Sequence, residues 1–151
     1  MPAEVIAVSN QKGGVAKTTT TMSLGACLVE LGYQTLIVDL DSQANLTLAA
    51  GMDPTALEHT IVDLFDGKQN GAYRRKTIQE GLHILPADLR LSRVERKLYE
   101  KGSYEETLRV MLQPWLDTYD FILLDCPPSF GAMTIIALMA ADRILIPVQC
   151  E

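Results

Sequence analysis

The chain has 151 residues, of which 48% are hydrophobic and 21% are charged, and its formal net charge is −6. This composition is typical of globular proteins and predicts a single domain over residues 1–151. No apolar run approaches the roughly 20 residues of a membrane helix, the N-terminus MPAEVIAV lacks the features of a secretion signal, and the acidic balance argues against strong nucleic-acid binding by these residues as a whole. Three cysteines at unrelated spacings fit a reduced cytoplasm better than a disulfide framework.

The first third of the chain predicts a strand, a helix and a second strand. Residues 5–8 form a short apolar run, which predicts a buried strand. A helix is predicted over residues 17–31, with Gly32 as its C-terminal stop. Residues 35–39 predict the next buried strand. The residues expected on the buried face of the helix are Leu24, Leu28 and Leu31.

The middle of the chain is less regular. Residues 60–65 predict a short helix that ends near Gly67, and residues 69–77 predict a polar loop. Residues 82–86 predict a third strand. An amphipathic helix is expected next, because Leu91, Val94 and Leu98 recur at helical spacing.

The last third repeats the alternation of helices and strands. Ser103 and Glu106 have the spacing of a capping box and predict the start of a helix, which Pro114 kinks or ends. Its inward residues are expected to be Tyr104, Leu108, Met111 and Leu112. Residues 121–125 predict a fourth strand, residues 132–140 a helix, and residues 143–148 a fifth strand of core type.

This alternation predicts an α/β fold. The strands are continuous apolar runs separated by helices, which indicates a doubly wound, mostly parallel sheet with helices on both faces. The sequence given stops at Glu151, directly after the last predicted strand. We therefore expect residues 1–151 to be the N-terminal part of a longer domain, incomplete at its C-terminus.

The stretch SNQKGGVAKTTT, between the first strand and the first helix, predicts a phosphate-binding loop. It departs from the common pattern G-x-x-x-x-G-K-S/T, because Gln11 and Ala16 stand where that pattern has glycine. Gly13 and Gly14 let the backbone approach phosphate oxygens, and the amides at the start of the helix face the anion. Lys17 is expected to bind the β- and γ-phosphates, and the Thr18 hydroxyl to bind Mg²⁺.

Three carboxylates are predicted to converge on this loop. Asp125 ends the apolar run FILLD, as expected of a Walker B carboxylate, and Asp39 and Asp41 follow the second strand. The C-terminal ends of parallel strands gather at one crevice. We expect Thr18, Asp39 and Asp125 to hold the metal and Asp41 to orient the attacking water. The alternative for 39–45 is a polar loop that leads into a short helix at residues 45–50.

The pattern K-G-G-x-x-K-S/T resembles the deviant Walker A motif of the ParA/MinD family of P-loop ATPases. NQKGG, DLDSQAN, DCPPSFG and PVQCE are similar to the ParA branch, of the short chromosomal or small-plasmid type. The resemblance covers residues 5–151. It implies ATP bound by Lys12, Gly13, Gly14, Val15, Ala16, Lys17, Thr18 and Thr19, with Mg²⁺ as the second cofactor. It also implies that Lys12 is catalytic and reaches the partner's phosphates across a homodimer.

The resemblance further implies a biological role. The ParA branch partitions chromosomes and plasmids: ATP binding forms a dimer that binds DNA, and slow Mg²⁺-dependent hydrolysis, stimulated by a ParB-like protein, resets it. Non-specific DNA binding is expected through residues beyond Glu151. The expected location is the cytoplasm, on the nucleoid, with no membrane association.

The departures from the family pattern concern the loops. Family members commonly have glycine at Ala16 and Ala44 and proline at Ser42. The Ala16 methyl group is expected to be a small intrusion, provided that the backbone there is compatible with alanine. Ser42 and Ala44 are expected to affect the hydrolysis rate more than binding. The alternatives are a MinD-like membrane-associated positioning ATPase, a nucleotide-binding module without hydrolysis and, least favoured, a relative of the nitrogenase iron protein.

Overall fold

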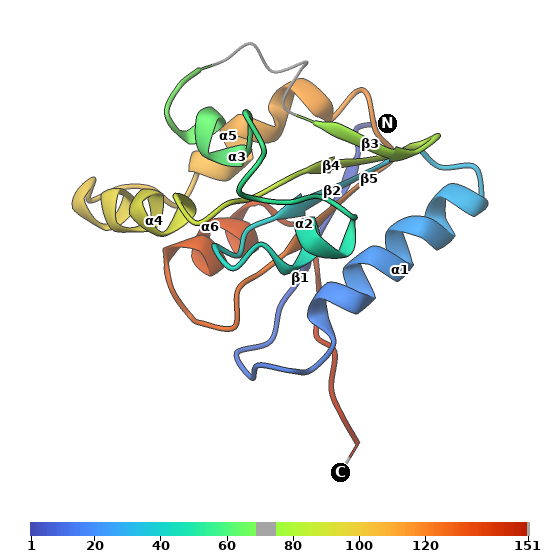
Figure 1. Ribbon diagram of the computed structural model, residues 1–151, viewed down its shortest axis with the longest axis horizontal. Helices are drawn as coiled ribbons and strands as arrows, with labels where there is room; N and C mark the ends of the chain where they lie inside the picture. Colours follow the sequence, from blue (N-terminus) through green and yellow to red (C-terminus); the bar gives the residue numbers. More distant parts are fainter. Residues whose placement is uncertain (69–74, 151) are drawn as a thin grey trace.

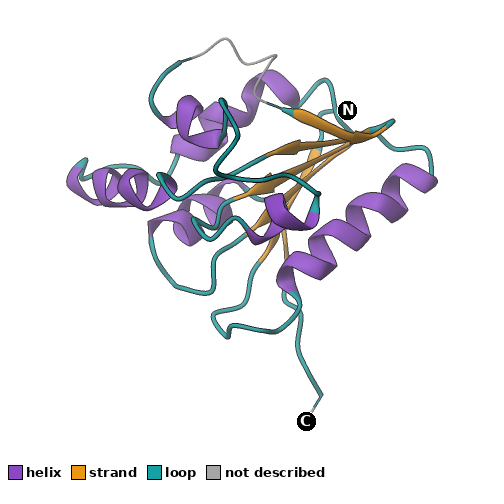
Figure 2. Ribbon diagram, in the orientation of Figure 1, coloured by secondary structure: helices purple, strands orange, loops and turns teal. Residues whose placement is uncertain are grey.

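The computed structural model describes residues 1–68 and 75–150, and it has the predicted α/β architecture (Figures 1 and 2). Six strands form one sheet in the order β3-β4-β2-β5-β1-β6. The strands are β1 (Glu4–Val8), β2 (Thr35–Asp39), β3 (Lys76–Gln79), β4 (Leu82–Leu85), β5 (Phe121–Asp125) and β6 (Arg143–Leu145). The helices are α1 (Lys17–Glu30), α2 (Asn45–Ala49), α3 (Ile61–Phe65), α4 (Leu91–Glu100), α5 (Thr107–Leu112), the 3₁₀ helix η2 (Gln113–Trp115) and α6 (Ala132–Ala140).

Helices cover both faces of the sheet (Figure 2). On one face, α1 and α2 pack over side chains of β2, β4 and β5, among them Ile37, Ile84 and Leu123. On the other face, α3 to α6 enclose a larger core with the alternate strand residues, such as Leu36 and Ile122. Strands buried on both faces need continuous apolar runs, and for this reason the sequence predicted β1, β2, β4 and β5 directly.

Parallel pairing brings the functional strand ends together. β5 lies between β1 and β2, with Asp125 in register with Val8 of β1 and with Asp39 of β2. The glycine loop follows β1, and the DLDSQAN stretch follows the end of β2. The predicted crevice is therefore at the C-terminal edge of the three central strands.

Two predictions at the edges of the sheet were wrong. Residues 76–77 were placed in a loop, but Lys76–Gln79 is β3, which pairs antiparallel with β4. The remainder of that predicted loop, 69–74, lies outside the described residues. The predicted strand 143–148 is shorter, and all three residues of β6 are exposed. Both strands lie at an edge of the described sheet and pair on one side only, and β3 is also largely polar. Local sequence predicts such strands poorly.

Two helix-end predictions also fail. The capping box at Ser103 does not form: α5 begins at Thr107, with Glu106 as its N-cap residue and no side-chain cap. Instead, the Glu105 carboxylate accepts a hydrogen bond from the Tyr104 amide, and the Tyr104 ring packs edge-on against Tyr99. Leu31, predicted to be inward, is 74% exposed, because α1 has already ended at Glu30.

Three other predicted helix boundaries agree with the structure. Gly32 has φ 93° and terminates α1, α3 carries a complete capping box from Thr60 and Asp63, and the chain leaves α5 through η2 at Pro114. Among the described residues, no helix is both long enough and apolar enough to cross a membrane.

Candidate nucleotide-binding site

The glycine loop between β1 and α1 forms one wall of an open pocket of about 440 Å³. All of the predicted nucleotide-binding residues from Gly13 to Thr19 line this pocket, together with Asp41. Asn45, Cys126 and Pro128 complete the lining. These three belong to the DLDSQAN and DCPPSFG stretches, but no specific role in the site was assigned to them from sequence. Lys12 is exposed and is not among the lining residues.

The loop requires two residues in the left-handed region of backbone conformation. Gly14 has φ 71°, where glycine carries no steric cost. Ala16, the N-cap residue of α1, has φ 60° and ψ 30°. The expectation that Ala16 adds only a small methyl intrusion was therefore incomplete, because its backbone lies in a region that costs a non-glycine residue about 1 kcal/mol or more.

Lys17 is buried at the base of the pocket, and its Nζ donates a 3.0 Å hydrogen bond to the Lys12 carbonyl oxygen. The ammonium group is thus held by the loop backbone itself. Its neighbour Thr18 donates from Oγ1 to Asp125 Oδ2 at 2.7 Å. The two side chains of the Lys17-Thr18 pair therefore bring a positive charge and a hydroxyl to the start of α1.

Asp125 is 1% exposed and accepts hydrogen bonds from Thr18 and, at 3.4 Å, from Thr21 Oγ1. The pKa of this carboxyl is raised from 3.8 to about 7, mainly by burial and to a smaller extent by the negative charges of Asp39 and Asp41, while the bonds from Thr18 and Thr21 lower it. A buried carboxylate whose charge is only partly compensated is a site where a cation binds favourably.

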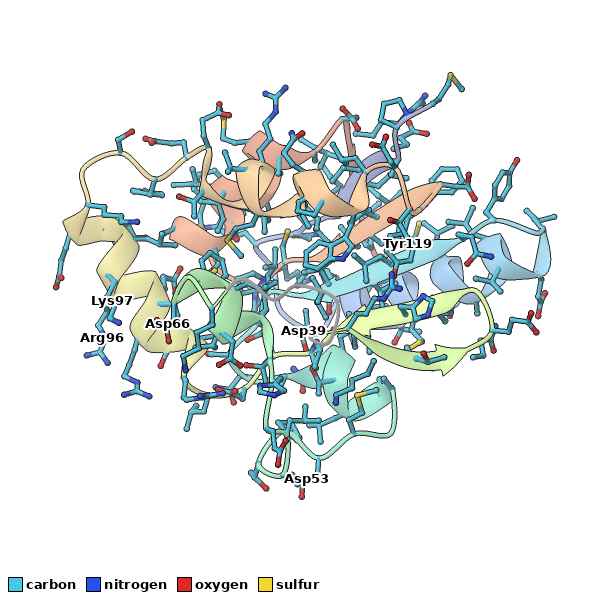
Figure 3. All side chains as sticks on the ribbon, turned by 90° about the horizontal axis from the view of Figure 1, so that it is seen from above. Asp39, Asp53, Asp66, Arg96, Lys97 and Tyr119 are labelled. Atoms are coloured by element: carbon cyan, nitrogen blue, oxygen red, sulfur yellow. The ribbon has the colours of Figure 1, made fainter. Side chains whose placement is uncertain are left out.

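Asp39 is fully buried in the interior of the molecule (Figure 3) and is not among the pocket-lining residues. Its Oδ2 accepts from the Thr47 amide at 2.9 Å and the Thr47 hydroxyl at 2.7 Å, and its Oδ1 accepts from the Asp41 amide at 3.1 Å. Burial raises the pKa of Asp39 to about 6, against the bonds from Thr47. The sequence did not identify Thr47 as part of the site, because nothing in its spacing links it to a carboxylate eight positions earlier.

These contacts make Asp39 a remote cap for α2. The N-cap residue of α2 is Ala44, which has φ 55° and offers no side-chain hydrogen bond. The Asp39 carboxylate instead satisfies the amide of Thr47, in the first turn of the helix. Asp39 thus fixes the start and the end of the loop that carries Asp41. Its predicted role as a metal ligand stays a prediction, and this geometry favours a loop-organising role.

Asp41 is placed differently from Asp39. Its side chain is half-buried and lines the nucleotide pocket, and its Oδ1 accepts from the Gln43 amide at 2.9 Å. This bond to the amide two residues later forms an Asx-type turn, which keeps the Asp41 carboxylate on the pocket side of the loop. This is the position that a group orienting a water molecule needs.

The donor set fits Mg²⁺. The Thr18 hydroxyl and the Asp125 carboxylate are hard oxygen ligands at hydrogen-bond distance from each other. Within residues 1–68 and 75–150, no group of three or more His, Cys, Asp or Glu side chains could hold a metal ion alone. Mg²⁺ in nucleotide sites takes one or two protein ligands and completes its shell with phosphate oxygens and water, which agrees with this arrangement.

Comparison with known proteins agrees with the geometry. A family model described as an AAA domain matches residues 3–151. The sporulation initiation inhibitor protein Soj of Bacillus subtilis is 42% identical over 149 residues, which cover 98% of this chain and 59% of that protein. The chromosome-partitioning ATPase Soj of Treponema pallidum is 43% identical over 143 residues, which cover 94% of this chain and 55% of that protein.

A solved structure from Mycobacterium smegmatis, described as cobyrinic acid a,c-diamide synthase with bound ATP analog and magnesium, superimposes with a TM-score of 0.94. It is 40% identical, and the match covers 99% of this chain and 61% of that one. The chain thus spans little more than half the length of the relatives that it matches. The resemblance inferred from the loop motifs is confirmed: the chain belongs to the AAA domain family and is homologous to the Soj/ParA chromosome-partitioning ATPases over nearly all of its length.

Proposed function

We propose that this chain binds ATP with Mg²⁺ and hydrolyses it as the nucleotide-binding part of a ParA-type partitioning ATPase. The observation that carries the proposal is the Thr18–Asp125 hydrogen bond of 2.7 Å at the edge of a glycine-loop pocket. It joins the two residues that a P-loop enzyme uses around its metal. The names of the Soj and ParA relatives support the same role.

Each residue then has a defined task. The amides of Gly13 to Thr19 and the Lys17 ammonium bind the phosphates, and Thr18 and Asp125 hold the metal. The metal, when bound, neutralises charge that develops on the phosphate oxygens. Asp41, which also lines the pocket, orients the water that attacks the γ-phosphorus. The bond between the γ-phosphorus and the β–γ bridging oxygen breaks as the new P–O bond forms. The bridging oxygen leaves with ADP, a proton of the attacking water passes to a phosphate oxygen, and inorganic phosphate is released.

Lys12 is proposed to act in a second copy of the chain. Its side chain is exposed and is not among the residues that line its own pocket. Its own carbonyl is already bonded to Lys17. In a face-to-face dimer, an exposed lysine at the rim of one pocket can supply positive charge to the phosphates in the other, where the transition state becomes more negative.

The wider assembly is also a proposal. We expect an ATP-dependent homodimer, a ParB-like protein that stimulates slow hydrolysis, and non-specific DNA binding through parts outside these 151 residues, on the nucleoid in the cytoplasm. The net charge of −6 supports placing the DNA-binding surface elsewhere.

A second candidate is suggested by the Mycobacterium smegmatis structure, which carries the name of a cobyrinic acid a,c-diamide synthase at 40% identity. Both functions use the same ATP pocket. They differ in the co-substrate: a partitioning ATPase turns over ATP without cobyrinic acid, and a synthase requires it. ATP turnover, measured with and without cobyrinic acid, distinguishes the two.

The proposal is tested by the solution mass of the chain, with and without ATP and Mg²⁺, in the wild type, Lys12→Ala and Lys17→Ala. A nucleotide-dependent dimer is expected in the wild type only. Lys12→Ala should bind ATP and remain a monomer, whereas Lys17→Ala should lose ATP binding. Lys101→Ala is the matched control, because Lys101 is an exposed lysine directly after the C-terminal end of α4. Unchanged ATP affinity in Lys17→Ala would sink the assignment of the loop.

A further inference from the structure

The N-terminus of α6 is capped by a residue from another helix. The N-cap residue of α6 is Gly131, which has no side chain to satisfy the first amides of the helix. Glu95 of α4 supplies the acceptor: its Oε1 lies 3.2 Å from the Met133 amide, 38 positions further along the chain. A carboxylate at a helix N-terminus is also favoured by the helix dipole.

The fit of Glu95 depends on the absence of a side chain at Gly131. A Cβ atom built there would lie 2.3 Å from Glu95 Oε1 and 3.3 Å from the Tyr99 hydroxyl. The backbone of Gly131 has φ −93°, which any residue adopts. A side chain at this position would therefore have to displace the Glu95 carboxylate from the helix end, whereas the backbone conformation itself does not call for glycine.

The loop that Glu95 anchors is one side of the nucleotide pocket. It runs from Asp125, the predicted metal ligand, to Gly131, and Cys126 and Pro128 within it line the pocket. Its far end is also tied to α6, since Thr134 Oγ1 donates to the Ser129 carbonyl at 2.6 Å. The start of α6 is thus joined directly to Ser129, the residue after Pro128.

Helix α4 contacts both loops of the candidate site. A smaller pocket of about 130 Å³ is lined by Leu91, Ser92 and Glu95 of α4, by Asp41 and Ser42 of the loop after β2, and by residues 127–129 of the loop after β5. Glu95 is the α4 residue in this group that also bonds to α6. It lies where the Asp41 loop and the Asp125 loop meet the same helix.

We infer that Glu95 is a positioning residue that holds the Asp125–Gly131 loop against the nucleotide pocket by capping α6. Glu95 does not line the nucleotide pocket and does not bond to the predicted metal ligands. Its influence on nucleotide chemistry therefore passes through the Asp125–Gly131 loop. The effect of Glu95 on ATP hydrolysis rests on the proposed function, whereas the hydrogen bond between Glu95 and Met133 does not.

The test compares four variants of the full chain: Glu95→Ala, Glu95→Gln, Gly131→Ala and the double variant Glu95→Ala/Gly131→Ala. Amide hydrogen exchange and ¹⁵N shifts of residues 126–133 report the loop, and ATP affinity and turnover report the site. Glu95→Ala should expose the Met133 amide to exchange several-fold faster, shift the loop resonances and reduce kcat, with KM little changed because residues 13–19 are untouched. Glu95→Gln retains an acceptor oxygen and should restore all of these readouts.

The Gly131 variants provide an independent arm. Gly131→Ala should displace Glu95 and reproduce the exchange pattern of Glu95→Ala. The double variant should be no worse than either single change, because the steric conflict and the bond disappear together. Glu100→Ala, on the exposed side of the same helix, should change none of these readouts.

Two results would overturn the inference: an unchanged Met133 exchange rate in Glu95→Ala, or strictly additive effects in the double variant. A loss of Met133 protection without any change in the loop shifts or in kcat would reduce Glu95 to a local cap and contradict its positioning role. If the wild-type chain itself binds no ATP, the proposed function fails, and the exchange and shift data alone then decide the role of Glu95.

Discussion

The Thr18 hydroxyl and the Asp125 carboxylate are joined by a 2.7 Å hydrogen bond although they are 107 positions apart in the chain. The bond links the first turn of α1 to the end of β5. It brings together a hydroxyl and a carboxylate that Mg²⁺ would engage together, and it stabilises an otherwise costly buried charge. The glycine loop and the Asp125 strand therefore form one unit, although each is identified separately in the sequence.

Replacing Asp41 with alanine should slow hydrolysis strongly and leave ATP binding intact. Asp41 lines the pocket but lies outside the loop that holds the phosphates. Loss of a group that orients water should reduce turnover by roughly 10²-fold, while the ATP dissociation constant changes little. Asp53→Ala is a matched control, because Asp53 forms the same type of turn with Thr55 but lies at the periphery (Figure 3). Normal turnover in Asp41→Ala would show that Asp41 does not orient the attacking water.

Removing the hydroxyl of Thr47 should destabilise the chain. This hydroxyl donates to Asp39 at 2.7 Å and accepts from the Ala87 amide at 2.9 Å. Thr47→Val keeps the shape of the side chain but leaves two buried groups short of a partner, at a cost of about 2 kcal/mol or more. Urea denaturation measures the loss, and Thr47→Ser, which keeps the hydroxyl, should recover most of it. Equal stability of the valine and serine variants would contradict the capping role of Asp39.

The stability of the nucleotide-free chain should depend on the protonation of Asp125. Its folded-state pKa is raised from 3.8 to about 7, mainly by burial. Between these values the folded state binds more protons than the unfolded state, so this group's stabilising contribution is complete below pH 4 and is lost as the pH rises to about 7. Asp125→Asn removes this dependence and should be more stable than the wild type by on the order of 3 kcal/mol at pH 8.

The matching experiment for Asp125 is urea denaturation of the wild type and Asp125→Asn from pH 5 to pH 8, without nucleotide or metal. The two curves should diverge with rising pH, and Mg²⁺ with ATP should stabilise the wild type only. If the stabilities of the two proteins ran parallel with pH, the negative charge of the buried Asp125 carboxylate would be compensated by its neighbours.

Glycine at position 16 should stabilise the chain. Ala16 has φ 60° and is exposed, so the substitution removes backbone strain without opening a cavity. The expected gain is about 1 kcal/mol in the free energy of unfolding. Ala49→Gly, at an exposed position within α2, should instead lower stability by a similar amount. A destabilising effect of Ala16→Gly would show that the loop conformation differs in solution.

The sequence by itself determined the features that depend on local order. The β1–loop–α1 unit was predictable because its strand, its glycines and its lysine lie within one short stretch, where each residue constrains its neighbours. The buried strands were predictable because a strand covered on both faces must be apolar throughout. The edge strand β3 was missed, since Lys76–Gln79 is half exposed and has no such requirement.

Only the tertiary structure decided which side chains meet. The cap that Asp39 provides to Thr47 and the cap that Glu95 provides to Met133 each join separate elements. No local pattern encodes these contacts, because each depends on the order in which the strands assemble and on the depth at which a carboxylate is buried. For the same reason, the sequence predicted a place at the site for both Asp39 and Asp41, whereas folding buries Asp39 in the interior and places Asp41 at the pocket.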